Sequence, residues 1–203
     1  MSYTSDVAFT DAVKRVQREH GSRAAYARME SIRGGFEAQL TPEVAAYIAA
    51  RDSAYLATAN AVGQPYVQHR GGPPGFIKVL GPQRLAFADF AGNRQYITTG
   101  NLSENDRAFL FLMNYAAGER IKIWGTARVV APDADLLERL TDPQYDARVE
   151  QAIVFDVSAW DANCSQHIPR LVHAEAVEAE VDALRERVRT LEEALREAGL
   201  SVS

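Results

Sequence analysis

The sequence predicts a mainly β fold, an antiparallel barrel or sandwich, with helices before and after it. Short strand-like stretches alternate with tight turns through the middle of the chain. Helical spacings and capping signals dominate the first fifty residues, and a heptad repeat occupies the end. We therefore expect three parts, which are an N-terminal helical segment (1–50), a β domain (51–170) and a C-terminal heptad helix (171–199).

The N-terminal segment is expected to form short helices. Val13 and Val16 sit at helical spacing, and Gly21 offers a stop before a second short helix. The run Thr41-Pro42-Glu43 is a stronger start signal. Threonine caps a helix, proline fits its first position, and an acidic side chain suits its positive end. A further helix should therefore run from there to near Arg51.

The β domain is predicted from alternating strand and turn signals. The expected strands are Ser53–Asn60, Pro65–Arg70, Phe76–Leu80, Arg84–Ala88, Arg107–Asn114, Glu119–Ala131 and one within Gln151–Val157. Two helices are expected to interrupt them, near Arg94–Ser103 and near Asp133–Leu140.

The C-terminal segment carries apolar residues at spacings of 4, 3, 4, 3 and 4, which is the a/d seam of a heptad repeat. These residues are Val177, Val181, Leu184, Val188, Leu191 and Leu195. An amphipathic helix packed on its own domain is one interpretation. The narrow stripe between charged flanks favours the other, which is a coiled coil between two copies.

Composition excludes several classes. The net charge of −5 disfavours nucleic acid as a partner. Cys164 is the single cysteine, so no intrachain disulfide can form, and we expect a reducing, cytoplasmic location. No apolar run approaches the roughly 20 residues of a membrane span, so no membrane partner is expected. The four histidines show no ligand spacing, so no metal site is expected either.

Two basic segments at strand ends are candidate ligand sites. Gln68-His69-Arg70 ends a strand and precedes the glycine- and proline-rich stretch Gly71–Gly75, where a ligand could approach the backbone. Asn93-Arg94-Gln95 follows another strand. Asn93 could cap a helix whose first turn holds Arg94, so that backbone N–H groups and the guanidinium face one anion. A wide turn with solvated arginines remains the alternative at both places.

Two further segments carry weaker signals. Alternation along Glu119–Arg128 places Lys122, Trp124 and Arg128 on one face, which suggests that a cofactor or partner covers it. The pair Cys164 and His167 would suit a nucleophile and base, but no third orienting group is evident.

Four segments in this order resemble the pyridoxamine 5'-phosphate oxidase-like FMN-binding split-barrel family, over roughly residues 41–170. They are PYVQHRGGPPGF, FADFAGNRQY, RIKIWGTARVV and NCSQHIPR. The resemblance is to a flavin-nucleotide-binding branch rather than to the oxidase proper. It implies a six-stranded antiparallel split barrel that forms a homodimer, with FMN bound in clefts between the subunits.

The resemblance also implies which residues meet the cofactor. Those expected to line the flavin, hold its phosphate or approach it from the other subunit are Gln68, His69, Arg70, Ile77, Lys78, Asn93, Arg94, Gln95, Trp124, Gln166 and His167. His69 and His167 are also the candidates for acid–base catalysis, because histidine titrates near neutral pH.

Departures from the oxidase shape the functional hypothesis. Its Ser-Arg-Lys turn is replaced here by Gly-Asn-Arg, and its C-terminal Arg-x-His signature is absent. Oxidation of pyridoxamine 5'-phosphate is therefore not expected. We expect an FMN-dependent oxidoreductase acting on an unidentified small molecule. The alternatives are a deazaflavin-dependent reductase and a non-catalytic flavin or haem carrier or sensor.

Overall fold

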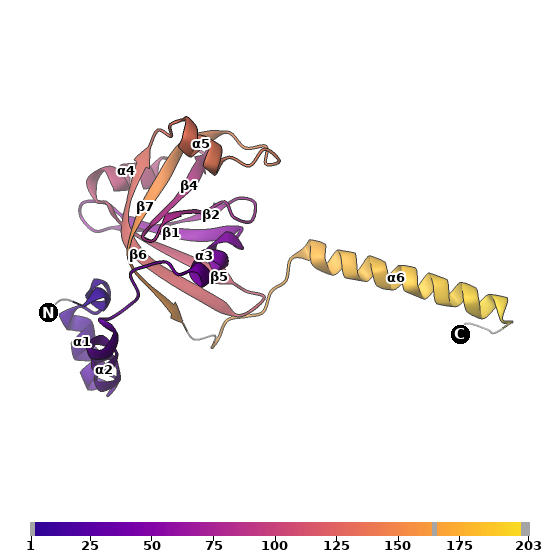
Figure 1. Ribbon diagram of the computed structural model, residues 1–203, viewed down its shortest axis with the longest axis horizontal. Coiled ribbons are helices and arrows are strands. Elements are labelled where there is room, and N and C mark those ends of the chain that lie inside the picture. Colours follow the sequence, from indigo (N-terminus) through magenta and orange to yellow (C-terminus); the bar gives the residue numbers. More distant parts are fainter. Residues whose placement is uncertain (1–2, 164–165, 200–203) are drawn as a thin grey trace. The chain divides into compact units, whose positions relative to one another are not determined.

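A computed structural model of the chain describes residues 3–163 and 166–199 (Figure 1). The described residues fall into two units. The first contains the chain up to Asn114 and again from Glu119 to the end of the last strand, and the second contains Tyr115–Gly118 and the chain from Gln166 onward. Among the described residues, no helix is both long and apolar enough to cross a membrane.

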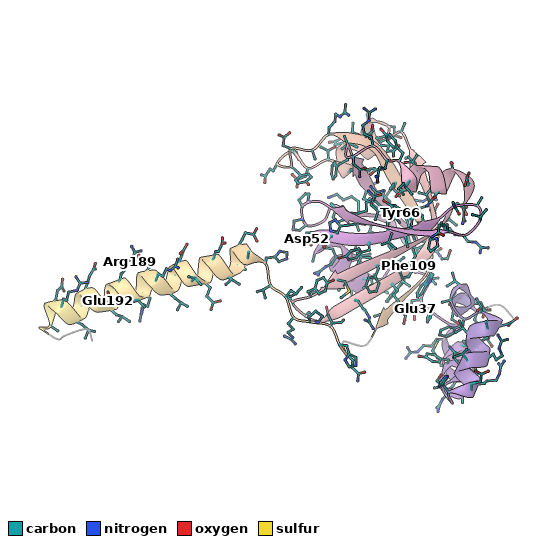
Figure 2. The ribbon with its side chains drawn as sticks, turned by 180° about the vertical axis from the view of Figure 1, so that it is seen from behind. Glu37, Asp52, Tyr66, Phe109, Arg189 and Glu192 are labelled. Carbon is teal, nitrogen blue, oxygen red and sulfur yellow. The ribbon has the colours of Figure 1, made fainter. Side chains whose placement is uncertain are left out.

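The second unit is dominated by α6 (Ala174–Glu197), a helix of 24 residues none of which is buried. Side chains project from it on all sides, Arg189 and Glu192 among them (Figure 2). The helix coincides with the predicted heptad repeat.

The first unit begins with four short helical elements. They are the 3-10 helix η1 (Thr4–Val7), α1 (Asp11–Glu19), α2 (Arg23–Arg33) and α3 (Pro42–Ala49). The start of α3 is as predicted, because Thr41 accepts a hydrogen bond from the Val44 N–H and Pro42 is the first helical residue. A buried carboxylate joins η1 to α2, since Glu30 forms an ion pair with Arg23 of its own helix and accepts a hydrogen bond from Ser5 at 3.0 Å.

The β domain is one antiparallel sheet of seven strands in the order β2-β1-β5-β6-β7-β4-β3. The strands are β1 (Ser53–Ala59), β2 (Pro65–Gly71), β3 (Lys78–Gly81), β4 (Arg84–Phe90), β5 (Arg107–Asn114), β6 (Glu119–Val130) and β7 (Val149–Asn163). Within the described residues β2 and β3 are edges that no ladder joins, so the sheet is open. The resemblance implied six strands, whereas the strand signals in the sequence already numbered seven.

Strand β7 is much longer than the segment predicted for it. It continues past residue 157, so Trp160 also lies on this strand. The extension is stabilised by the N-terminal segment. The Trp160 N–H donates to the Glu37 carbonyl at 2.7 Å, and its indole N–H donates to the Gln39 carbonyl at 2.9 Å. The added pairing partner comes from residues distant in sequence, which local strand signals cannot show.

The pairing of β6 with β7 contains a bulge at Gly125. A Cβ atom built there would lie 2.0 Å from the Asp156 carbonyl oxygen. Glycine is therefore required by the close approach of two backbones.

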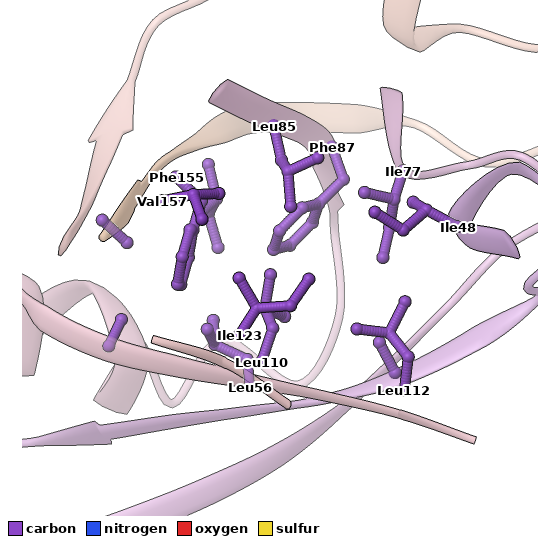
Figure 3. Close-up of a cluster of buried hydrophobic side chains, with 14 of the residues drawn as sticks. Ile48, Leu56, Ile77, Leu85, Phe87, Leu110, Leu112, Ile123, Phe155 and Val157 are labelled. Carbon is purple, nitrogen blue, oxygen red and sulfur yellow. The ribbon is translucent and has the colours of Figure 1, made fainter. Parts of the chain in front are cut away.

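The core lies on the inner face of the sheet, as the alternation within each strand predicts. Figure 3 shows inward side chains from β1, β4, β5, β6 and β7 meeting in one cluster. Leu56, Phe87, Leu110, Ile123 and Phe155 all have 0% exposure there. Each such side chain contributes about 1.5–3 kcal/mol relative to the exposed state. Gln68 and Arg70 of β2 lie on this same inner face, because they pair with the buried Leu56 and Ala54 of β1, and they are available to form a site beside the core.

Candidate functional site

A pocket of about 240 Å³ lies where β2 and β4 end, beside the turn that precedes α4 (Ile97–Glu104). Four residues predicted to bind a cofactor line it, namely Gln68, Arg70, Asn93 and Arg94. Gln68 and Arg70 share one face of β2 because side chains two residues apart on a strand point the same way.

Arg70 is the central cation of this pocket, and its side chain is 10% exposed. Its guanidinium forms an ion pair with Asp89 and donates from Nη2 to the Gln68 side-chain oxygen at 3.1 Å. Its Nε, however, has no hydrogen-bond partner. Of the buried side-chain nitrogen and oxygen atoms in the described residues, it is the one left unsatisfied. A buried donor without a hydrogen bond costs about 1–3 kcal/mol, so a ligand atom that accepts a hydrogen bond from Nε would remove this cost.

A hydrogen-bonded frame fixes the Arg70 side chain in place. Asp89 of β4 also accepts a hydrogen bond from the Gln151 amide of β7 at 2.8 Å, and that amide donates to Thr99 of α4 at 2.9 Å. Thr98 donates to the Gln68 side chain at 2.8 Å. Three strands and one helix therefore orient the pocket before any ligand arrives. Sequence reasoning missed Asp89, Thr98, Thr99 and Gln151, because polar residues at strand and helix positions carry no local sign of convergence.

The turn before α4 differs from its prediction. The helix starts at Ile97, so Asn93 is not its N-cap and Arg94 is not in its first turn. Instead, Asn93 accepts a hydrogen bond from the Gln95 N–H at 3.2 Å, which makes an Asx turn. Arg94 and Tyr96 both have left-handed backbones, with φ of 60° and 53°. Such strain in non-glycine residues is concentrated at functional sites.

Arg94 is the second cation of the pocket and is exposed. Its Nε donates to the Tyr96 hydroxyl at 3.3 Å, and that hydroxyl donates to Glu150 at 2.8 Å. The hydrogen bond with Tyr96 raises the pKa of Arg94, so its charge is permanent. At 3.3 Å this hydrogen bond is long, which leaves the guanidinium free to turn toward an anion in the pocket.

Three other predicted residues lie outside the pocket. His69 points to the opposite face of β2, where its ring packs against the Tyr55 ring with centroids 5.7 Å apart. The Ile77 side chain lies in the core at 2% exposure, which leaves only its backbone for a ligand. Lys78, on the edge strand β3, lines a different pocket together with Arg139.

The Gly71–Gly75 loop needs its glycines because other atoms of the same chain pack closely against Gly72 and Gly75, and these contacts leave no open space for a ligand at the two glycines. A Cβ at Gly72 would lie 2.7 Å from the Phe76 Cβ, and one at Gly75 would lie 3.2 Å from the Ala49 carbonyl oxygen. The Gly72 N–H donates to the Asp52 carbonyl at 3.0 Å. The loop is thus folded back against the end of α3 and the start of β1.

Trp124 is partly covered by aromatic side chains of its own chain, whereas the sequence suggested a cofactor or partner as the cover. Phe36 stacks on it with ring centroids 5.3 Å apart, and Phe109 packs at 5.2 Å. The Lys122 ammonium lies 5.2 Å from the ring centroid. Trp124 lines a separate pocket of about 630 Å³ with Thr58, beside β1 and β5.

The tail residues belong to the second unit. Gln166 and His167 are exposed, and His167 has a φ of 62°. Their roles toward the cofactor stay predictions. Cys164, whose pairing with His167 is a weak signal in the sequence, lies outside the described residues. Within the described part of the chain, no group of three or more acidic, histidine or cysteine side chains could hold a metal ion.

Three solved structures are similar at low identity. HupZ from Group A Streptococcus is 12% identical, with 65% of this chain and 99% of that chain covered and a TM-score of 0.47. An FMN-binding protein from Syntrophomonas wolfei subsp. wolfei is 12% identical, with 78% and 98% covered and a TM-score of 0.43. HutZ, the haem storage protein from Vibrio cholerae, is 15% identical, with 60% and 90% covered and a TM-score of 0.42.

No curated protein sequence matches the chain. The family model described as pyridoxamine 5'-phosphate oxidase matches residues 40–185, well over half of the 203 residues. That range contains every strand of the sheet and the whole Arg70 pocket. The chain therefore belongs to the pyridoxamine 5'-phosphate oxidase-like family.

Proposed function

We propose that this protein binds FMN and uses it as an oxidoreductase on an unidentified small molecule. The observation that carries the proposal is the unpartnered Nε of Arg70, which is buried in a pocket that also holds the exposed cation Arg94. Family membership supports the choice of a flavin nucleotide.

The pocket residues fit the phosphate end of FMN. Arg70 would donate through Nε while Asp89 and Gln68 keep its terminal nitrogens in place. Arg94 would turn from Tyr96 to the phosphate, since charge-assisted hydrogen bonds are stronger than neutral ones. Asp89 is the ion-pair partner of Arg70, whereas Arg94 is linked to Glu150 only through the Tyr96 hydroxyl, so a phosphate would give Arg94 a direct anionic partner.

Bound FMN supplies the electron or hydride transfer, and the protein contributes binding, orientation and hydrogen bonds to the ring. The ring would extend away from the phosphate pocket. His69 and His167, which lie in the segments that carry the family resemblance, remain the proposed proton donors or acceptors. The missing oxidase signatures make pyridoxamine 5'-phosphate a poor substrate.

The proposal includes a homodimer with one FMN per chain and a cytoplasmic location. In the family arrangement the flavin lies between subunits, so Trp124, Gln166 and His167 would approach the cofactor of the other chain. Light scattering of the purified protein at micromolar concentration should give the mass of a dimer. A monomer at that concentration contradicts this part of the proposal.

The visible absorption spectrum of the purified protein is the first test. Flavin bands support the proposal, whereas a deazaflavin band or a Soret band would select the reductase or the haem carrier instead. Turnover with reduced flavin and candidate electron acceptors then separates an oxidoreductase from a flavin carrier or sensor.

A variant tests the phosphate assignment directly. Arg94→Ala should weaken FMN binding by about 1.5–3 kcal/mol, the value of a hydrogen bond to a charged group. Riboflavin, which lacks the phosphate, should be affected much less. Arg28→Ala, which removes an exposed arginine of α2 away from the pocket, is the matched control and should change neither affinity. Equal losses for FMN and riboflavin would move Arg94 away from the phosphate.

A further inference from the structure

The helix α6 carries an apolar stripe that nothing in its own unit covers. The six a and d side chains are between 36% and 59% exposed, and α6 has no buried residue. A helix in a protein gains most of its stability by packing such a stripe against a partner. We therefore expect another apolar surface to pack against this stripe.

The identity of the a and d residues points to a two-stranded pair. The spacing places Val181 and Val188 at a positions and Leu184 and Leu191 at d positions. Valine at a with leucine at d favours parallel dimers over larger bundles. Ala174 at a and Ala198 at d extend the stripe at its two ends.

The surface of α6 already contains the hollow that such a pair needs. An open groove is lined by Val181, Leu184, Arg185 and Val188, together with the charged Asp182 and Arg189. The first four occupy positions i, i+3, i+4 and i+7, which are the four residues that form the hole for a d-position side chain of a facing helix. Leu184 of a second, parallel copy in register is the side chain that would enter it.

The charges at the flanking e and g positions select both the partner and its direction. In a parallel pair, each g residue faces the e residue five positions later on the other helix. Glu180 would then face Arg185 of the partner subunit, and Arg187 would face Glu192 of the partner subunit. Both pairs are attractive, and each occurs twice in the dimer.

The antiparallel arrangement lacks this complementarity. In an antiparallel pair aligned over the full stripe, e positions face e and g positions face g. Arg185 and Arg187 would each face their own copies, and Glu178 would face Glu192. In the single chain Arg185 bonds Asp182 at 3.2 Å, but both side chains are more than 70% exposed, so this contact contributes little and is easily exchanged.

We propose that α6 forms a parallel, in-register, two-stranded coiled coil with α6 of a second copy of this chain, selected by the Glu180–Arg185 and Arg187–Glu192 pairs. This pairing does not depend on flavin binding, so each can fail without the other.

Cysteine cross-linking of the full-length chain tests the pairing and its direction. In a Cys164→Ser background, Val177→Cys and Leu195→Cys place one thiol near either end of the stripe. A parallel pair brings identical positions within disulfide reach, so both single variants should give covalent dimers on mild oxidation. Cross-links that form only when the two variants are mixed would show an antiparallel pair. Absence of cross-links from all samples would mean that α6 packs elsewhere. Either result overturns the proposal.

Charge exchange tests the selecting pairs. Arg185→Glu/Arg187→Glu and Glu180→Arg/Glu192→Arg each make every g–e pair repulsive, whereas a mixture of the two variants makes every pair attractive. Combined with Leu195→Cys, each variant alone should give roughly tenfold less cross-linked dimer, which corresponds to a loss of about 1.4 kcal/mol in the free energy of pairing. The mixture of the two variants should recover the original yield. Arg189→Glu/Arg196→Glu makes the same charge change on the outer face and should leave the yield unchanged. A mixture that fails to recover, or a control that loses as much, contradicts the assigned pairs. Flavin absorbance of the same samples separates failure of this pairing from failure of the proposed cofactor.

Discussion

Replacing Arg70 tests whether the frame of the pocket is a buried charge network. Arg70→Met keeps an unbranched side chain of similar reach, so packing is largely retained while the charge is lost. The carboxylate of Asp89, only 14% exposed, would then keep the Gln151 amide as its remaining donor within the frame described above.

The expected cost follows from that burial. Breaking a buried ion pair by removing one partner costs about 3–5 kcal/mol. The lower end applies here, because Asp89 retains one hydrogen bond and some contact with water. We therefore expect the free energy of unfolding of the flavin-free protein to fall by about 3 kcal/mol.

The double variant Arg70→Met/Asp89→Asn separates the energy lost with the ion pair from the cost of leaving the Asp89 carboxylate buried without its cation. It removes the leftover carboxylate charge, so it should recover about half of the loss. Urea unfolding followed by circular dichroism gives both values from the midpoint and slope. A double variant no more stable than Arg70→Met would refute the view that Asp89 is left as a buried, poorly paired charge.

The remaining predictions concern the pairing of β6 with β7 and its acid sensitivity. Gly125→Ala should lower the free energy of unfolding by at least about 2 kcal/mol, because the added methyl group overlaps the Asp156 carbonyl. Gly100→Ala in α4, where no atom lies within 4 Å of the added methyl group, is the control and should be neutral or stabilising. Thermal melts of both variants give the comparison, and equal losses of stability at Gly125 and Gly100 would contradict the close approach of the two backbones. Burial of Asp156 raises the pKa of its carboxyl group, but hydrogen bonds from Arg84 and Arg128 outweigh burial, so the pKa of Asp156 lies below its ordinary value. Its contribution is therefore present above the unfolded pKa and is lost as the pH falls below about 4 and through the lowered folded pKa. Asp156→Asn should cost less than about 1 kcal/mol at neutral pH, because the pairs are partly exposed, and that difference should vanish in acid. An unchanged difference at low pH would assign the effect to something other than the charge.

Local signals located most elements because they act over a few residues. Thr41 and Pro42 started α3, alternation along β6 put Ile121 and Ile123 in the core, and the heptad spacing marked α6. The same signals misplaced the start of α4, because the left-handed backbones of Arg94 and Tyr96 are not favoured by those residue types.

By itself the sequence determined the order of helices and strands, the inner face of the sheet and the basic character of Arg70 and Arg94. Only the tertiary structure decided which of these residues meet. It joined β2, β4, β7 and α4 around Arg70, turned His69 and Ile77 away, and covered Trp124 with Phe36. The physical reason is that strand periodicity fixes the face on which a side chain lies. Which faces and strand ends adjoin depends on pairings between residues far apart in sequence, and those are chosen by burial of the whole core.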